Sequence, residues 1–370
     1  MDWLRGLGVG IVVAVGLWVV TGTALSLSRH PHWYIRGWDF PRTVVALLAV
    51  LSGALYAAFI ARGRWYDLAF LAAVGLALLW QVVMIRPYTR IARRQVEDAT
   101  RATPESTFRL VISNVLQDNR EHDRWWQVVS REDPDLVLAL EVDHTWDRVL
   151  SSRLGRSHPH QVRHVLDNCY GIALYSRLPL KAPQVAFLVQ ADIPSIHTRF
   201  TLRGGLDVWL HAIHPRPPEP LRGQDSAPRD AELMKVAKMI GDREPCPTVV
   251  AGDLNDVAWS HTTNLFLKES GLLDPRLGRG FYNSFDANSP IFRFPLDHVF
   301  HSRDFRLVEL RRLAHVGSDH FPMSIALSHE PEAAREQAPP PATRRDEEEA
   351  EEMIDRAGQG GPARGSAADA

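Results

Sequence analysis

The sequence predicts a mixed α/β domain joined to a membrane anchor of three helices. Long apolar runs fill residues 1–86, and short strand-like and helix-like runs alternate through residues 107–329. Apolar periodicity is then lost from residue 330 onward. We therefore expect an anchor at 1–86, a basic and polar linker at 87–106, a globular domain at 107–329 and a tail at 330–370.

Three apolar runs near the start are long enough to cross the ~30 Å hydrocarbon core of a bilayer. They are Leu7–Leu27, Thr43–Ala61 and Leu68–Ile85. A cleaved signal peptide is the alternative for the first run, but such a segment has only ~7–15 apolar residues, and two further runs follow here. We expect an integral membrane protein in contact with the lipid bilayer, of the kind found in the bacterial inner membrane.

Arginine residues near the ends of these runs favour one orientation in the membrane. Positively charged flanks tend to remain in the cytoplasm. The residues Arg29, Arg36, Arg42, Arg86, Arg90, Arg93 and Arg94 on one side outnumber Arg5, Arg62 and Arg64 on the other. The sequence therefore predicts that the globular domain is cytoplasmic.

Strands and helices are expected to alternate through the globular domain. Short apolar runs that end at turn residues predict strands, and longer amphipathic runs predict helices. The expected strands are 108–115, 135–142, 170–180, 206–215, 247–255, 296–302 and 305–313, and the expected helices are 121–132 and 230–242. This alternation is typical of an α/β domain. The tail at 330–370 is rich in Pro, Ala, Gly and charged residues, so we expect it to be disordered.

Composition argues against several classes of protein. The formal net charge of −2 provides no general basic field for nucleic acid. The two cysteines, Cys169 and Cys246, form neither a disulfide framework nor a CxxC metal motif. The G-x-S-x-G motif of many serine hydrolases is missing from the sequence.

Polar residues recur where the predicted strands end. In chain order they are Asn114, Glu141, His214, Asp253, Asn255, Asp297, Asp319 and His320. Each residue alone has an ordinary explanation as a turn or helix-capping residue. Strand ends in α/β sheets, however, hold side chains on a rigid frame beside a crevice. The complete set therefore predicts a catalytic site.

In this order, the sequence resembles the endonuclease/exonuclease/phosphatase superfamily, as a bacterial-type membrane-anchored member. The matching runs, spread over Phe108–Leu327, are "SNVLQDN", "PDLVLALEVD", "GIALYSRLPL", "LHAIHP", "AGDLND", "LDHVF" and "GSDHFP". The resemblance implies a four-layer α/β sandwich, in which helices flank two packed mixed sheets and the active site lies at one end. It also implies metal-dependent hydrolysis of a phosphoester, which could be a phospholipid, a nucleic acid or a small molecule.

The resemblance implies that Glu141 is the principal carboxylate ligand of Mg²⁺, with Mn²⁺ as an alternative. Asn114 and Asp319 would complete the surroundings of the metal or contact the phosphate. Hard cations of this kind prefer oxygen ligands. Some relatives carry a second acidic residue where this chain has Leu116, which argues against a second tightly bound metal.

The resemblance also implies roles for the remaining residues. Asp253 would position or deprotonate the attacking water, and Asn255 would donate a hydrogen bond to a phosphoryl oxygen. His320 would be the catalytic histidine, and Asp297 would fix its orientation, as carboxylates commonly do for imidazoles. His214 would lie near the leaving group. The alternative function is a membrane scaffold that carries a catalytically inactive domain.

Overall fold

The computed structural model describes residues 2–218, 225–243 and 246–359, which divide into two compact units. One unit extends to Arg93 and includes the short segment Leu277–Gly280, and the other holds most of the remaining chain from Arg94. The boundary therefore falls inside the expected linker at 87–106. From Arg94 onward this segment packs on the second unit, where Ala99 N donates to Leu307 O at 2.8 Å.

The first unit contains three helices that are long and apolar enough to cross a membrane. They are α1 (Asp2–Ser26), α3 (Arg42–Phe59) and α4 (Trp65–Ile85), joined by the short helices α2 (Trp33–Arg36) and η1 (Gly37–Asp39) and followed by η2 (Arg86–Tyr88). Large apolar side chains such as Phe59 and Leu76 are exposed on their outer faces. Such faces suit contact with lipid tails rather than with water.

A buried polar network connects the three long helices. Arg42 Nη1 of α3 donates to Gln81 Oε1 of α4 at 3.1 Å, and Gln81 Nε2 donates to Thr23 Oγ1 of α1 at 2.8 Å. The Arg42 guanidinium also pairs with Asp39. Because polar groups in an apolar setting need partners, this network favours one alignment of the three helices.

The second unit is built on two mixed β-sheets. In spatial order, the six-stranded sheet contains β10 (Phe305–Arg312), β11 (Met323–His329), β1 (Thr107–Asn114), β2 (Leu136–Leu140), β4 (Ile172–Ser176) and β3 (His160–His164). The five-stranded sheet contains β5 (Leu180–Ala186), β6 (Ser195–Thr201), β7 (Asp207–Ala212), β8 (Thr248–Asp253) and β9 (Asp297–His301).

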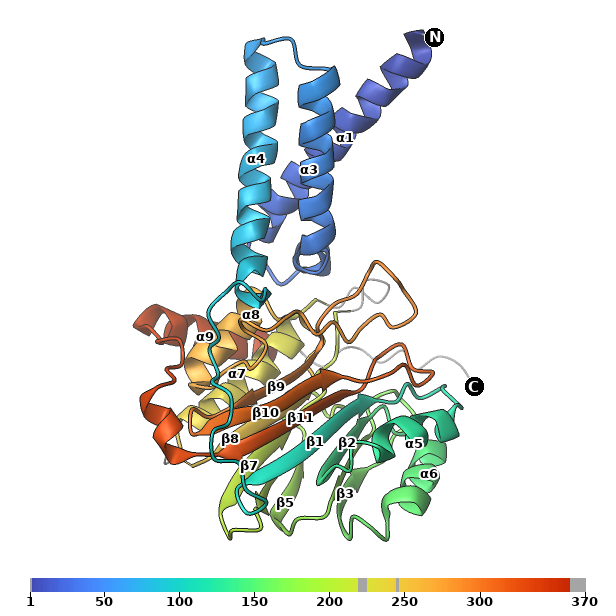
Figure 1. The fold of residues 1–370 in the computed structure, drawn as a ribbon, viewed down its shortest axis with the longest axis vertical. Coiled ribbons are helices and arrows are strands. Elements are labelled where there is room, and N and C mark those ends of the chain that lie inside the picture. Colours follow the sequence, from blue (N-terminus) through green and yellow to red (C-terminus); the bar gives the residue numbers. More distant parts are fainter. Residues whose placement is uncertain (1, 219–224, 244–245, 360–370) are drawn as a thin grey trace. The chain divides into compact units, whose positions relative to one another are not determined.

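Helices cover the outer faces of both sheets (Figure 1). They are α5 (His122–Ser130) and α6 (His144–Leu154) on the six-stranded sheet, and α7 (Ala227–Gly241) and α8 (His261–Ser270) on the five-stranded sheet. The inner faces meet in a core that includes Ile112, Leu138 and Leu210. These four layers confirm the α/β sandwich predicted from the sequence.

Strand direction brings distant residues to one end of the two sheets. β1 and β2 run in parallel with Asn114 beside Leu140, so Glu141 follows directly at the same edge. β8 and β9 run antiparallel with Asp253 opposite Asp297. β11 is antiparallel to β1, so His320, just before β11, lies where β1 ends.

The expectation that residues 330–370 are disordered is wrong for the described part of that segment. It forms η4 (Pro331–Arg335) and α9 (Arg344–Gln359), while residues 360–370 lie outside the described residues. Ala350 and Met353 of α9 are buried in the core formed with α7 and α8. Lys268 Nζ of α8 donates to Asp346 Oδ1 at 2.8 Å. A short apolar stripe and ion pairs with lysine thus hold the acidic helix α9 against α7 and α8.

Shortening the buried side chain in α9 should destabilise the second unit. We expect Met353→Ala to lower the free energy of unfolding by about 2 kcal/mol, because it removes buried methylene groups and leaves a cavity. Urea unfolding of the full chain in detergent measures the change. The control Glu352→Ala alters an exposed neighbour and should stay within about 0.5 kcal/mol. Equal stability of both variants would show that α9 contributes no core.

Candidate active site

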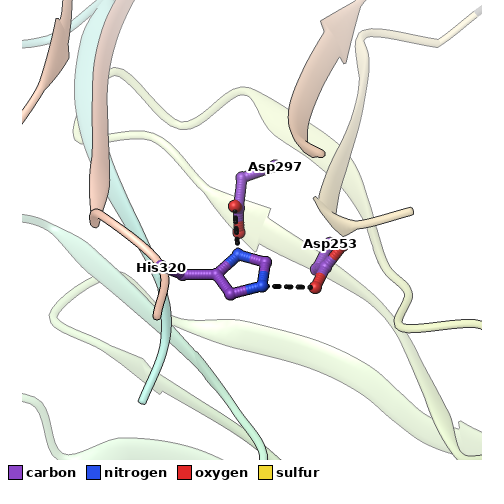
Figure 2. A group of neighbouring side chains, drawn as sticks. All are labelled: Asp253, Asp297 and His320. Atoms are coloured by element: carbon purple, nitrogen blue, oxygen red, sulfur yellow. Dashed lines mark hydrogen bonds and ion pairs between the residues drawn. The ribbon is translucent and has the colours of Figure 1, made fainter. Parts of the chain in front are cut away.

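Three buried side chains meet at the end of the sheets where the predicted site residues gather. His320 Nδ1 lies 2.7 Å from Asp297 Oδ2, and His320 Nε2 lies 3.5 Å from Asp253 Oδ2. Figure 2 shows the imidazole ring between the two carboxylates. The ring is therefore oriented from one side by β9 and faces the end of β8 on the other.

The electrostatics of this group favour a charged imidazole. Burial alone would lower the pKa of His320, but the carboxylates of Asp297 and Asp253 outweigh burial and raise that pKa to about 10. Burial raises the pKa of Asp253, although the neighbouring His320 opposes this shift. At neutral pH the imidazolium thus carries a proton on each nitrogen, and Asp297 accepts one of them.

Glu141 and Asn114 form the adjacent part of the site. Asn114 ends β1, and its Nδ2 donates to Glu141 Oε1 at 2.8 Å and to Asp253 Oδ2 at 3.2 Å. Gln117 N donates to Glu141 Oε2 at 3.2 Å. Glu141 follows β2 with a φ of 61°, and nearby Leu116 has a φ of 58°. This left-handed backbone conformation costs energy for residues other than Gly and Asn.

The donor set fits a divalent cation. Burial raises the pKa of Glu141, although hydrogen bonds to its carboxylate and the charge of His320 oppose this shift. Oxygen atoms dominate the group, as hard cations such as Mg²⁺ require. Ligand atoms of Asp253, Asp297 and His320 also lie within 4.8 Å of one another. The bond from His320 to Asp297 already occupies one ligand atom of each of these two residues.

The end of β8 and the loop after it place Asp253 and Asn255 beside the end of β7. Gly252 has a φ of 149°, and a Cβ there would lie 1.9 Å from Ile213 O, so glycine permits this close approach. Asn255 has a φ of 50°, and its backbone N donates to Asp253 Oδ1 at 2.9 Å. Its Nδ2 donates to Pro215 O at 3.0 Å, which fixes the orientation of the amide.

His214 lies next to Asp253 but differs from His320 in charge. His214 Nε2 is 3.8 Å from Asp253 Oδ2. Burial and the neighbouring His320 lower the pKa of His214 to about 3. Its imidazole is therefore neutral at physiological pH. It can donate one hydrogen bond but does not carry an additional acidic proton.

The structure brings together all of the residues that the sequence predicted for this site. Asp319 is half-buried, and its carboxylate acts on Glu141 and His320 through space. Sequence reasoning missed Ser318, whose Oγ donates to Asn114 O at 2.8 Å and accepts from His320 N at 3.0 Å. The position of Ser318 directly before Asp319 and His320 was the one feature of the sequence that could have identified it.

Arg229 of α7 is a second residue that sequence reasoning missed. Its Nη1 donates to Asn255 O at 2.7 Å, and its Nη2 lies 2.7 Å from Asp230 Oδ1 and 3.3 Å from Asp256 Oδ2. The guanidinium is fully buried. It thus supports the loop that follows Asp253 and contains Asn255.

Removing the Arg229 guanidinium should strongly destabilise the protein. We expect Arg229→Met to lower the free energy of unfolding by about 3–5 kcal/mol, because buried carboxylates then lose their partner. Urea unfolding of the full chain in detergent tests this. Arg303→Met, at an exposed position, serves as the control and should stay within about 0.5 kcal/mol. An Arg229→Met chain as stable as the control would refute a supporting role.

Comparison with known proteins agrees with the geometry. The four layers and the acidic site with its histidine are typical of metal-dependent phosphoester hydrolases. Residues 111–320, more than half of the chain, match the Endonuclease/Exonuclease/phosphatase family, and the chain belongs to this family. Members of the family are metal-dependent phosphoester hydrolases. A comparison with curated proteins gave no match.

Several solved structures are similar to this chain at low sequence identity. A humanized TDP2 from D. rerio has a TM-score of 0.50 and 16% identity over 60% of this chain and 99% of its own. D. rerio TDP2 complexed with a single-strand DNA product gives the same four values. An endonuclease/exonuclease/phosphatase from Beutenbergia cavernae has a TM-score of 0.47 and 18% identity over 61% of this chain and 72% of its own.

Proposed function

We propose that this chain is a membrane-anchored phosphoester hydrolase that uses Mg²⁺, with Mn²⁺ as a substitute, and cleaves phosphodiesters. The observation that carries this proposal is the buried Asp297–His320–Asp253 group directly beside Glu141 and Asn114. It combines an oriented imidazole with oxygen ligands for a cation. Both can promote phosphoester hydrolysis, since negative charge develops on the phosphoryl and leaving oxygens.

Glu141, with Asn114 and Asp319 around it, would hold the cation. When bound, the cation supplies positive charge that polarises a phosphoryl oxygen. The raised pKa of Asp253 suits a residue that orients the attacking water and accepts its proton. In this proposal Asp253 orients and deprotonates the water, while Glu141 binds the metal.

The remaining side chains would act on the phosphate. His320 donates from Nε2 to a phosphoryl oxygen, and Asp297 holds the ring in place. The second N–H of the Asn255 amide donates to another phosphoryl oxygen, since Pro215 O takes only the first. His214, being neutral, donates a hydrogen bond near the leaving oxygen.

The membrane part of the proposal is supported by the three candidate spans. With an odd number of crossings, the start of the chain and the catalytic domain lie on opposite sides of the bilayer. The arginine distribution favours a cytoplasmic catalytic domain in a bacterial inner membrane. Protease treatment of spheroplasts tests this orientation. Digestion of the catalytic domain by protease added outside the spheroplasts would contradict the cytoplasmic location.

A substrate panel tests the activity itself. The full chain in detergent is assayed with bis(p-nitrophenyl) phosphate, p-nitrophenyl phosphate, single-strand DNA and phospholipid, with Mg²⁺ and with EDTA. Mg²⁺-dependent cleavage of a diester, abolished in His320→Ala, is the expected result. Failure of the folded chain to cleave any ester would instead support the alternative of an inactive membrane scaffold.

A further inference from the structure

A hairpin-like tip borders the active site. Phe285 and Phe294 pair through their backbones, and residues 286–293 form the tip between them. The Phe285 ring lies 4.9 Å from the His320 ring, measured between centroids, and Ala287 N donates to Asp319 O at 2.6 Å. The tip is thus attached to two residues of the site.

The tip exposes two adjacent large apolar side chains. Ile291 is 68% exposed and Phe292 is 52% exposed. The backbone beneath them is internally bonded, because Ser289 Oγ accepts from Ile291 N at 3.3 Å and from Phe292 N at 2.9 Å. In the described part of the second unit, the other large exposed apolar residues, Phe187 and Val308, are isolated in sequence. Paired exposed side chains on an ordered tip are typical of an interaction surface.

Two arginines lie at the tip: Arg293 is its last residue, and Arg312 contacts the same aromatic ring as Arg293. The guanidinium carbons of Arg293 and Arg312 lie 5.1 Å and 4.4 Å from the centre of the Phe321 ring. Both arginines also donate hydrogen bonds to backbone oxygens, Arg293 to Ser289 O and Arg312 to Asn283 O. Among the described residues, neither arginine has a carboxylate within ion-pair distance. Two like charges beside Phe321, the residue that follows His320 in the chain, therefore remain available to an anion.

We propose that Ile291 and Phe292 insert into a lipid surface, that Arg293 and Arg312 bind anionic lipid headgroups there, and that the substrate is a phospholipid phosphodiester. This inference rests on the proposed function and specifies its substrate. Hydrolysis adds one water across a P–O bond of the lipid, releasing an alcohol and leaving a phosphomonoester. The lipid phosphate would reach the site from the surface that the tip contacts.

Charge and shape favour lipid over nucleic acid. Apolar side chains flanked by arginines match the boundary between acyl chains and anionic headgroups. Single-strand binding instead uses aromatic platforms along a basic groove, and the aliphatic Ile291 offers no ring on which a base can stack. The chain also carries three candidate spans, so a bilayer is the surface to which this domain is tethered.

The experiment uses the full chain in nanodiscs of phosphatidylethanolamine and phosphatidylglycerol. Release of lipid products is followed by mass spectrometry, and bis(p-nitrophenyl) phosphate reports on the same preparation. We expect Ile291→Ser/Phe292→Ser to lower the lipid rate at least ~10-fold, equivalent to ~1.4 kcal/mol, while the rate on the soluble ester stays within ~2-fold. The matched control Phe187→Ser/Val308→Ser should change neither rate.

The arginines are tested separately from the apolar pair. Arg293→Gln/Arg312→Gln should lower the lipid rate and remove its dependence on the phosphatidylglycerol fraction, because that dependence reflects attraction to anionic headgroups. An equal loss on lipid and on the soluble ester would overturn the proposal, since the tip would then support the site itself. Unchanged lipid turnover, or turnover of single-strand DNA alone, would also overturn it.

A reading independent of turnover separates docking from catalysis. In a Cys169→Ser/Cys246→Ser background, Phe292→Cys is labelled with the polarity-sensitive dye NBD, and Phe187→Cys provides the control. The label at 292 should brighten on transfer from detergent-free amphipol to nanodiscs, and the label at 187 should not. If no ester is cleaved, the proposed function and the lipid substrate fail, whereas the label still decides whether the tip docks. Equal signals at 292 and 187 would refute docking.

Discussion

Replacing His320 with alanine should lower turnover at least ~10²-fold, because the oriented donor to the phosphoryl oxygen is lost. Asp297→Asn should be milder, since the imidazole remains while its orientation is weakened. The double variant should lose much less than the product of the two single losses, as expected for groups that act as one unit. Turnover is measured on the diester that the substrate panel identifies.

A second variant guards against misfolding in the His320 experiment. His320→Ala leaves Asp297 and Asp253 buried without the cation between them, which can destabilise the protein. His320→Gln retains an N–H donor for one carboxylate, and Tm identifies the folded variants. His315→Ala replaces another histidine of the same segment and should keep near-normal turnover. Near-normal turnover of a folded His320 variant would eliminate the assignment.

Glu141→Gln should also lower turnover at least ~10²-fold, and unlike the His320 variant it should need at least ~10-fold more Mg²⁺ for the half-maximal rate. The amide keeps the shape of the side chain but loses the charge that holds a hard cation. EDTA should abolish turnover of the unchanged chain, and Mg²⁺ or Mn²⁺ should restore it.

Binding of Mn²⁺, followed by electron paramagnetic resonance, gives a reading of this site that does not depend on turnover. Glu141→Gln should weaken this binding, and the exposed control Glu105→Gln should leave it unchanged. Equal Mn²⁺ affinity in the two variants would place the metal elsewhere. The group formed by Asp253, Asp297 and His320 would then be the next candidate.

Much of the site could be predicted because its residues lie at the ends of strong strand patterns. Asn114, Asp253 and Asp297 each end or begin a buried strand. Strand pairing places Asp253 opposite Asp297, and the packing of the two sheets brings Asn114 beside them. Arg229 could not be found in this way. It reaches Asn255 O from the first turn of helix α7, and only the packing of α7 against the loop after β8 creates that contact.

The tail shows where composition misled the prediction. The run "DEEEAEEMID" contains so much negative charge that it is typical of a solvated segment. Ala350, Met353 and Ile354 nevertheless share one helical face, which fills the core against α7 and α8. The partners of the acidic residues, including Lys238 and Lys268, lie far away in the sequence. Their contribution appears only in the folded chain.

The left-handed backbone at Leu116 and Glu141 has a consequence for laboratory evolution of this enzyme. Glycine at either position would relieve strain of about 1 kcal/mol, so selection for heat resistance alone would favour both changes. Leu116→Gly would spare the proposed metal ligands, whereas Glu141→Gly would remove the carboxylate that we propose as the principal one. Selection for thermal stability must therefore be combined with a screen for turnover, because stability alone would also enrich inactive variants.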